Sequence, residues 1–170
     1  MDPNIMHREF LESTLGILKE YKQLGEKALQ QIPKDKWDWQ YNDNSNSVSV
    51  LVKHLWGNMM SRWTDFLNSD GEKPWRQRDA EFEAENISPK ELMEKWEEGW
   101  MTLFEAISDL TIADMEKEVL INGKNHSVYD ALLRQLAHYA SHIGQILYIG
   151  KMLKDQSWIN LSVPKRPSTN

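Results

Sequence analysis

The segment LLRQLAHYASHIGQILYIGKML, residues 132–153, constrains the fold more than any other part of the chain. It is long, mostly apolar and contains no proline, so it predicts a buried helix. Apolar residues occur on more than one side of this helix. Such a helix either lies at the centre of a fold or packs against a second subunit, and we expect a homodimer formed through this helix and its neighbours. Two histidines, His138 and His142, lie in its middle.

Three further helices are expected upstream. Apolar residues recur at helical spacing over about 4–32, 47–68 and 88–110. No strand-rich region separates them. The sequence therefore predicts an all-α fold, a four-helix bundle, formed by residues 1–170 as a single domain.

Local signals mark some of the helix ends. Ser88, Pro89 and Glu91 form an N-cap, a first-turn proline and a capping box. Ser127 is placed to cap the last helix, and an Asn122-Gly123 turn between the last two helices could be flanked by a few extended residues. These signals fix where the last two helices begin.

Composition excludes several classes of protein. A net charge of −6 without a Lys/Arg cluster argues against nucleic-acid binding. No apolar run approaches the ~20 residues that span a bilayer, and the first residues lack the apolar core of a signal peptide. We therefore expect a cytoplasmic protein without a membrane partner. Because the chain has no cysteine, it can form neither disulfides nor thiolate metal sites.

His138 and His142 are four residues apart in the apolar segment. In an α-helix this spacing offsets two side chains by only ~40° around the axis and ~6 Å along it. The two imidazoles could therefore bind one metal ion, or each could be a satisfied core or interface residue. A buried imidazole needs partners for both nitrogens, which makes a pair of them costly in an apolar helix and favours the metal site.

Two imidazoles bind a divalent metal only weakly, so a third ligand is expected. The remaining histidines are His7, His54 and His126. His126 would lie ~18 Å from His138 along a helix, and His7 only ~5 Å into the first helix, far from the histidine pair. His54 is the remaining candidate.

Depth along the bundle supports His54 under one condition. If the 47–68 helix runs antiparallel to the last helix with their ends level, the two histidines lie at nearly the same depth. His54 is then ~21 Å, and His142 ~22 Å, from the same end of the bundle. An antiparallel arrangement requires a crossover, and the 70–87 connection is long enough to supply it. The predicted metal ligands are therefore His54, His138 and His142.

Three histidines leave a coordination position open, which is the pattern of catalytic rather than structural zinc sites. Asn58, Gln135 and Gln145 lie within a turn of these histidines and could support the ligands or contact a substrate, or be ordinary polar residues of a bundle. Arg76 and Arg78 could hold an anionic substrate group, or they could pair with the acidic residues of the same segment. No catalytic residue is identifiable.

Eight tryptophans are unusual in a chain of this length, and Trp37, Trp39, Trp75 and Trp158 fall outside the helical patterns. They could cover the ends of the core. They could also form an aromatic rim around a ligand pocket, because aromatic side chains commonly line such sites.

A histidine in VLVKHLWGN followed far downstream by LAHYASHIGQI resembles the DinB/YfiT-like superfamily of metalloenzymes. The resemblance extends over HLWGNMMSRWTDFLNSDGEKPWRQRDAEFE and the terminal WINLSVPKRPSTN, to an uncharacterised subgroup, a domain of unknown function. It implies an up-down-down-up four-helix bundle, often dimeric, with nickel or zinc bound by His54, His138 and His142. Characterised relatives include transferases and isomerases that use low-molecular-weight thiols such as bacillithiol, mycothiol or glutathione.

The expected function is therefore a metal-dependent enzyme, a transferase that joins a low-molecular-weight thiol to a small electrophilic substrate. Two alternatives stay open. One is a non-catalytic dimeric bundle that binds a metal or a ligand. The other is a metal-dependent hydrolase.

Overall fold

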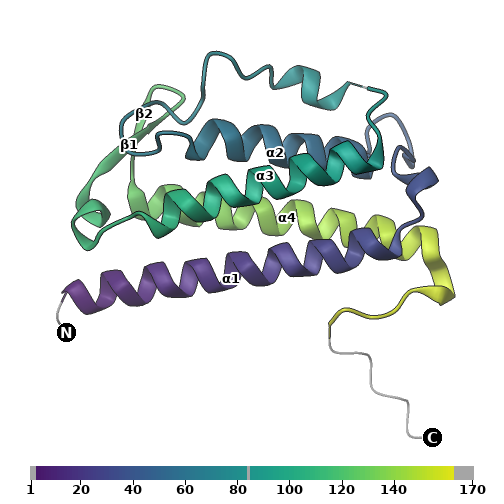
Figure 1. The fold of residues 1–170 in the computed structure, drawn as a ribbon, viewed down its shortest axis with the longest axis horizontal. Helices are drawn as coiled ribbons and strands as arrows, with labels where there is room; N and C mark the ends of the chain where they lie inside the picture. Colours follow the sequence, from purple (N-terminus) through teal and green to yellow (C-terminus); the bar gives the residue numbers. More distant parts are fainter. Residues whose placement is uncertain (1–2, 84, 163–170) are drawn as a thin grey trace, which may run out of the picture.

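The computed structural model describes residues 3–83 and 85–162. In this part of the chain it contains four long helices and one short hairpin (Figure 1). The helices are α1 (Pro3–Gln31), α2 (Val48–Trp63), α3 (Pro89–Ser108) and α4 (Val128–Lys154), and the hairpin strands are β1 (Glu118–Ile121) and β2 (Lys124–Ser127). The prediction of an all-α fold is confirmed.

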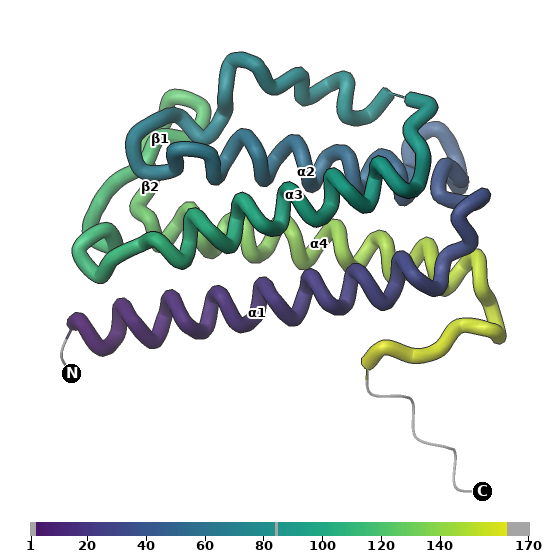
Figure 2. Tube along the Cα trace, viewed as in Figure 1, coloured from purple at the N-terminus to yellow at the C-terminus, as the bar shows by residue number. Residues whose placement is uncertain are grey.

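The helices are arranged up-down-down-up. α1 and α4 run side by side in one direction, whereas α2 and α3 lie together and run in the other (Figures 1 and 2). The connection between α2 and α3 returns along the full length of the bundle and makes these two helices parallel. α2 and α4 are therefore antiparallel, as the depth comparison required.

α2 ends earlier than expected. Its N-terminus is capped by Ser47, whose Oγ accepts a hydrogen bond from the Val50 amide at 3.2 Å. Its last residue is Trp63 rather than Asn68, because Thr64 is extended and Asp65 takes a positive φ of 50°. The short polar side chains here bond to the local backbone and compete with the helix. The predicted end was wrong, although the antiparallel direction was right.

The start of α3 and the hairpin follow their sequence signals. The Ser88 amide donates to the Glu91 carboxylate at 2.9 Å, and the Glu91 amide donates to Ser88 Oγ at 3.2 Å, which completes the capping box. Asn122 and Gly123 have φ values of 51° and 70°. Two consecutive positive φ values define the tight turn that suits a two-residue hairpin loop.

One continuous core joins the four helices. Its largest fully buried side chains include Trp63, Trp96, Trp100 and Tyr139. Almost every residue of α2 is buried, because the connection from α2 to α3 covers the side of α2 that the other helices leave open. α2 is thus the most enclosed helix, and a polar side chain on it must find its partners inside the protein.

The covering connection is fastened at one end to the hairpin. The Asp70 carboxylate accepts hydrogen bonds from the Asn122 and Gly123 amides at 2.8 and 2.7 Å, and the Gly71 amide donates to the Leu120 carbonyl at 2.8 Å. Further along, a short 3₁₀ turn, η2 (Asp79–Phe82), rests against α2. These contacts set the position of η2 over the middle of α2.

α4 is only partly covered within the single chain. One side of it, with Leu133 at 51% and Tyr148 at 64% exposure, is open to solvent. The reason is that α4 packs chiefly on α1 and α2, and no element of the described chain covers its outer side. Within the described residues, no helix is both long and apolar enough to cross a lipid bilayer.

Candidate metal centre

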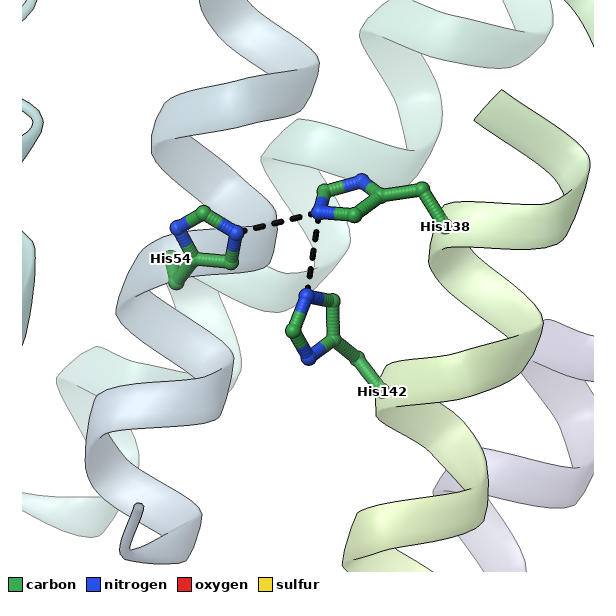
Figure 3. A group of neighbouring side chains, drawn as sticks. All are labelled: His54, His138 and His142. Atoms are coloured by element: carbon green, nitrogen blue, oxygen red, sulfur yellow. Dashed lines mark hydrogen bonds between the residues drawn. The ribbon is translucent and has the colours of Figure 1, made fainter. Parts of the chain in front are cut away.

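The three predicted histidines meet between α2 and α4. His54 projects from α2, and His138 and His142 project from consecutive turns of α4 (Figure 3). His138 Nε2 lies 3.1 Å from His54 Nε2 and 3.0 Å from His142 Nε2. One ligand nitrogen from each ring lies within 4.8 Å of the others. The antiparallel pairing of α2 and α4 therefore brings together residues 84 positions apart.

The spacing of these nitrogens fits a metal ion. With metal–nitrogen bonds of about 2.0–2.1 Å, two nitrogens of a tetrahedral site are separated by about 3.3 Å. The two closest pairs here, at 3.1 and 3.0 Å, are slightly tighter than that edge. Within the part of the chain that the structure describes, the group contains no fourth histidine or carboxylate. An ion held by these three rings would keep a position for solvent or substrate.

The far side of the His54 ring is held by a residue that the sequence did not single out as a site residue. His54 Nδ1 lies 2.8 Å from Glu81 Oε2, in the η2 turn. Burial opposes ionisation of Glu81, but hydrogen bonds from His54 and Arg76 lower its pKa below the usual value. An ionised carboxylate cannot donate, so His54 Nδ1 carries the proton and donates it. The Nε2 lone pair of His54 is consequently directed at the centre, as a carboxylate–histidine pair does in metal sites.

Gly57 makes the approach of Glu81 possible. It lies on α2 within one turn of His54, and a Cβ atom placed on Gly57 would overlap the Glu81 carboxylate. Any larger residue would displace the Glu81 carboxylate from this position. A glycine inside a helix costs stability relative to alanine, by about 1 kcal/mol. Here the missing side chain provides the space for the carboxylate that holds His54.

Arg76 fixes Glu81 from the other direction. Its Nε and Nη2 donate to Oε1 and Oε2 of Glu81 at 2.8 and 2.9 Å, a two-pronged pair in which the Arg76 side chain is only 3% exposed. Nη1 of Arg76 reaches the Glu72 carboxylate at 3.3 Å. The Arg76 guanidinium is therefore already engaged with two carboxylates, which matches the alternative that the charges of this segment pair with one another.

The two histidines of α4 are in a different environment. Burial, and then the neighbouring His142, His54 and two arginines, lower the pKa of His138 to about 3. Burial and then His54 lower the pKa of His142 to about 4, and the nearby Gln145 amide opposes this shift. Both rings are thus neutral near pH 7 with lone pairs available. Their Nδ1 atoms are buried and have no hydrogen-bond partner of normal geometry.

Asn58 and Gln135 belong to the buried interior rather than to the histidine group. Asn58 Oδ1 accepts a hydrogen bond from the Tyr139 hydroxyl at 3.0 Å, and the same hydroxyl accepts one from Trp63 Nε1 at 2.9 Å. Gln135 is 6% exposed, and its Oε1 has no partner. Asn58 therefore has a structural bond, and the role proposed for Gln135 stays a prediction.

Arg78 lies at the edge of the site. Its side chain is 60% exposed, and its guanidinium carbon is 5.5 Å from the centre of the Phe82 ring. The Phe82 ring in turn lies 4.9 Å from the His54 ring, between centroids. Arg78 Nη1 lies 3.8 Å from the exposed Asp79 carboxylate, so of the two arginines Arg78 is the more accessible to an incoming anionic group, whereas Arg76 is enclosed.

The other two histidines lie elsewhere, as the depth comparison predicted. His126 pairs with Asp130 at 2.6 Å, at the start of α4. His7 Nδ1 approaches the Ile112 carbonyl at 3.3 Å, and its ring packs edge-on against Tyr129. Neither belongs to the group of three.

Glu81 is the residue beside the histidines that the sequence did not single out. The signal that could have found it is Gly57, an unexplained glycine one turn from a candidate ligand in a helix of large residues. Such a glycine often marks a close approach of another group. It does not say which group approaches, because the partner lies 24 residues downstream in a connection without helical or strand periodicity.

Comparisons with known proteins assign the chain to a family. No match was found among curated protein sequences or among solved structures. A family model described as a protein of unknown function, DUF1572, matches residues 5–167, nearly the whole chain. The match includes all four helices and the three histidines. The chain therefore belongs to the DUF1572 family of proteins of unknown function.

Proposed function

We propose that the chain is a metal-dependent enzyme in which His54, His138 and His142 hold one divalent ion, zinc or nickel. Its reaction would transfer a low-molecular-weight thiol to a small electrophilic molecule. The observation that carries the proposal is the convergence of three imidazole Nε2 atoms from two antiparallel helices, at separations of 3.1 and 3.0 Å. This donor set suits either metal, because imidazole nitrogen binds both.

The side chains around the centre each have a defined part in this proposal. A metal ion held by the three histidines would lower the pKa of a thiol or water bound at its open position and make that group nucleophilic near neutral pH. Glu81 keeps the His54 ring in one orientation with its proton on Nδ1. Phe82 packs against one side of the His54 ring. Arg78 can attract an anionic thiol cosubstrate to the edge of the site.

The thiol chemistry rests on the resemblance to the DinB/YfiT-like superfamily. Membership of DUF1572 names no activity. The up-down-down-up arrangement agrees with the bundle that the resemblance implies. A chain without cysteine would receive its thiol as a cosubstrate. The superfamily, the thiol and the choice of metal are therefore parts of the proposal.

One observation favours a non-catalytic rival, a bundle whose metal is structural. The carboxylate nearest the histidines, Glu81, is engaged by Arg76 and His54, so it is not free to act as a general base. A metal-bound thiol ionises with less help from a base than metal-bound water does. The engagement of Glu81 therefore also weighs against the hydrolase alternative.

Metal content tests the centre directly. Purified wild-type protein, His138→Ala and the matched control His7→Ala are analysed by inductively coupled plasma mass spectrometry after saturation with zinc or nickel and desalting. We expect about one ion per chain in wild type and in His7→Ala, and a large loss in His138→Ala, because two imidazoles bind a divalent ion weakly. Equal metal in all three proteins would overturn the site.

Activity is tested separately on the metal-loaded protein. Glutathione, bacillithiol and mycothiol are each offered with monochlorobimane, which becomes fluorescent when a thiol is attached to it. Thiol-dependent fluorescence that is lost in His138→Ala supports the transferase. A protein that binds metal but accelerates no pair of substrates is the non-catalytic binder instead.

We also propose a homodimer formed through α4. The outer side of its first half exposes Leu133 and Ala137, and no element of the described chain covers them. Light scattering after size-exclusion chromatography measures the mass in solution. We expect twice the mass of 20.0 kDa for wild type and a monomer for Leu133→Glu. A monomeric wild type at micromolar concentration contradicts this.

A further inference from the structure

A cavity of about 840 Å³ lies beside the histidine centre. One wall is the segment from Trp39 to Asn46, which leads into α2, and the other is the outer side of the second half of α4, from Ser141 to Met152. Its size lies within the range of small-molecule sites, about 300–1,000 Å³. Of the residues proposed to bind the metal or to support its ligands, Gln145 lines the cavity and the others do not.

The cavity adjoins His142. Ser141 precedes this histidine in α4 and lines the cavity. Gln145, one turn further, also lines it, and its amide lies close enough to His142 to influence the pKa of that ring. A molecule in the cavity would therefore contact residues that flank His142, whose Nε2 belongs to the histidine group.

The lining is aromatic and contains no charged residue. Trp39, Tyr41 and Tyr148 contribute rings, and Ile149 and Met152 contribute aliphatic and thioether groups. Charged residues make up 27% of the chain, yet not one of those that the structure describes lines this cavity. An ion placed here would lose hydration without gaining a counter-charge, which is costly, whereas a flat uncharged molecule can stack on the rings.

Polar but neutral groups complete the lining. They are the amides of Asn44, Asn46 and Gln145 and the hydroxyls of Ser45 and Ser141. Amides and hydroxyls both donate and accept hydrogen bonds, so they suit carbonyl, amide or hydroxyl groups of a ligand. They fix the orientation of a neutral molecule without requiring charge.

We propose that this cavity binds the organic substrate of the histidine centre, and that this substrate is an uncharged aromatic molecule with a carbonyl, amide or hydroxyl group. The inference rests on the proposed function, since it places the electrophile beside the proposed thiol position. It adds a division of the site: the neutral electrophile lies on the cavity side of His142, and an anionic thiol approaches past Arg78.

Gly144 allows the cavity to be blocked without disturbing the core. It is exposed on α4 and lines the cavity, and a Cβ atom on it would meet no other atom within 4 Å. Gly144→Leu should therefore fill the cavity while the helix is retained, because leucine is the better helix former. Gly16 on α1 is a matched control, since a Cβ there also meets nothing within 4 Å and the residue is absent from the cavity lining.

Binding is measured by ligand-observed NMR titration with three related probes: acetanilide, which is neutral, 4-acetamidobenzoate, an anion, and 4-(aminomethyl)acetanilide, a cation. We expect acetanilide to bind wild type and Gly16→Leu equally. We expect both ions, and acetanilide with Gly144→Leu, to bind at least about ten-fold more weakly, a difference of about 1.4 kcal/mol. Circular dichroism and thermal melting confirm that both leucine variants fold.

Three results would overturn the inference: no acetanilide binding to wild type, an ion that binds as tightly as acetanilide, or equal binding by the two leucine variants. A second copy of the chain is the competing occupant. If Gly144→Leu turns a dimer into a monomer and leaves acetanilide binding unchanged, the cavity is a subunit contact instead.

The same titration separates this inference from the proposed function. Acetanilide binding is repeated on metal-stripped wild type and on His138→Ala, in which the cavity lining is intact. Acetanilide binding by a protein that takes up no metal would support the proposed cavity and contradict the proposed metal centre. Full metal uptake without acetanilide binding would support the metal centre and contradict the cavity.

Discussion

Two polar clusters bridge α2 and α4 within a few turns of each other, and they differ in how well they are satisfied. In the first, the Tyr139 hydroxyl accepts from Trp63 and donates to Asn58, so every polar group of the tyrosine is bonded. In the second, no described residue gives the Nδ1 atoms of His138 and His142 a hydrogen bond of normal geometry. A satisfied buried network stabilises a fold, whereas an unsatisfied one costs free energy. The first cluster is therefore structural, and the difference supports the proposal that the histidine group holds a metal ion.

The largest difference between the two clusters should appear when metal is added. Metal at about 100 times its dissociation constant should raise the free energy of unfolding of wild type by about 2.7 kcal/mol, because it binds only the folded state. His138→Ala should lose nearly all of this gain, while Tyr139→Phe keeps it. Thermal melting with and without zinc or nickel measures the effect. An equal gain in both variants would show that metal binds elsewhere.

The second-largest effect is expected from losing the Glu81 carboxylate, which lies behind His54. Glu81→Gln removes the charge that orients the His54 proton, and Gly57→Ala leaves no room for the carboxylate. We expect each to lower metal affinity by about 10–100-fold, the usual effect of losing such a partner. Isothermal titration calorimetry measures it. Gly16→Ala is the control for adding a methyl group to a helix, and unchanged affinity in Gly57→Ala would mean that Glu81 plays no part.

A substitution in the cluster around Tyr139 should lower the stability of the protein and leave its metal affinity unchanged. Tyr139→Phe leaves the Trp63 Nε1 donor and the Asn58 carbonyl without their bonds in a fully buried position. We expect the free energy of unfolding to fall by about 1–3 kcal/mol, with metal affinity unchanged. Urea denaturation and the calorimetric titration together check this. A loss of metal affinity in Tyr139→Phe would show that the two clusters are coupled.

The smallest effect concerns pH. In the unfolded chain both α4 imidazoles take up protons below their ordinary pKa of 6.5, whereas in the folded, metal-free protein burial keeps His142 neutral to about pH 4 and His138 to about pH 3. The unfolded state therefore binds more protons in this range. The free energy of unfolding should decline as the pH falls from 6.5 toward 4. Urea denaturation across this range should show a shallower decline in His138→Ala, and identical slopes would contradict the assignment.

Periodicity and local chemistry made most of the fold predictable. The four apolar patterns predicted the four helices. The Ser88–Glu91 signal correctly marked the start of α3, and the Asn122-Gly123 signal correctly marked the turn of the hairpin. These features depend on residues close in sequence, so a single sequence carries them. The end of α2 was missed because the chain turns at Asp65, whose carbonyl accepts from the Asn68 and Ser69 amides, whereas the apolar pattern continues through Phe66.

The candidate centre was predictable in part, for the same reason. His138 and His142 share one helix, and their spacing alone aligns them. His54 could be added only under an assumed direction of α2, and the expected depth used a helix end that was wrong. Glu81 could not be placed, because nothing in the η2 segment gives its distance from α2.

Local patterns in the sequence were enough to specify the helices, the all-α class and the two aligned imidazoles, because hydrophobic periodicity and helical spacing involve residues close in the chain. Long-range packing set three further features. α2 runs antiparallel to α4 at the level of the histidines, Gly57 leaves room for Glu81, and a cavity without charged residues among its described lining lies next to residues that flank His142. Each of these depends on how the long connection from α2 to α3 and the segment before α2 close over the bundle. These segments bring together residues that are distant in sequence. The free energy of their contacts comes from packing rather than from local conformational preference.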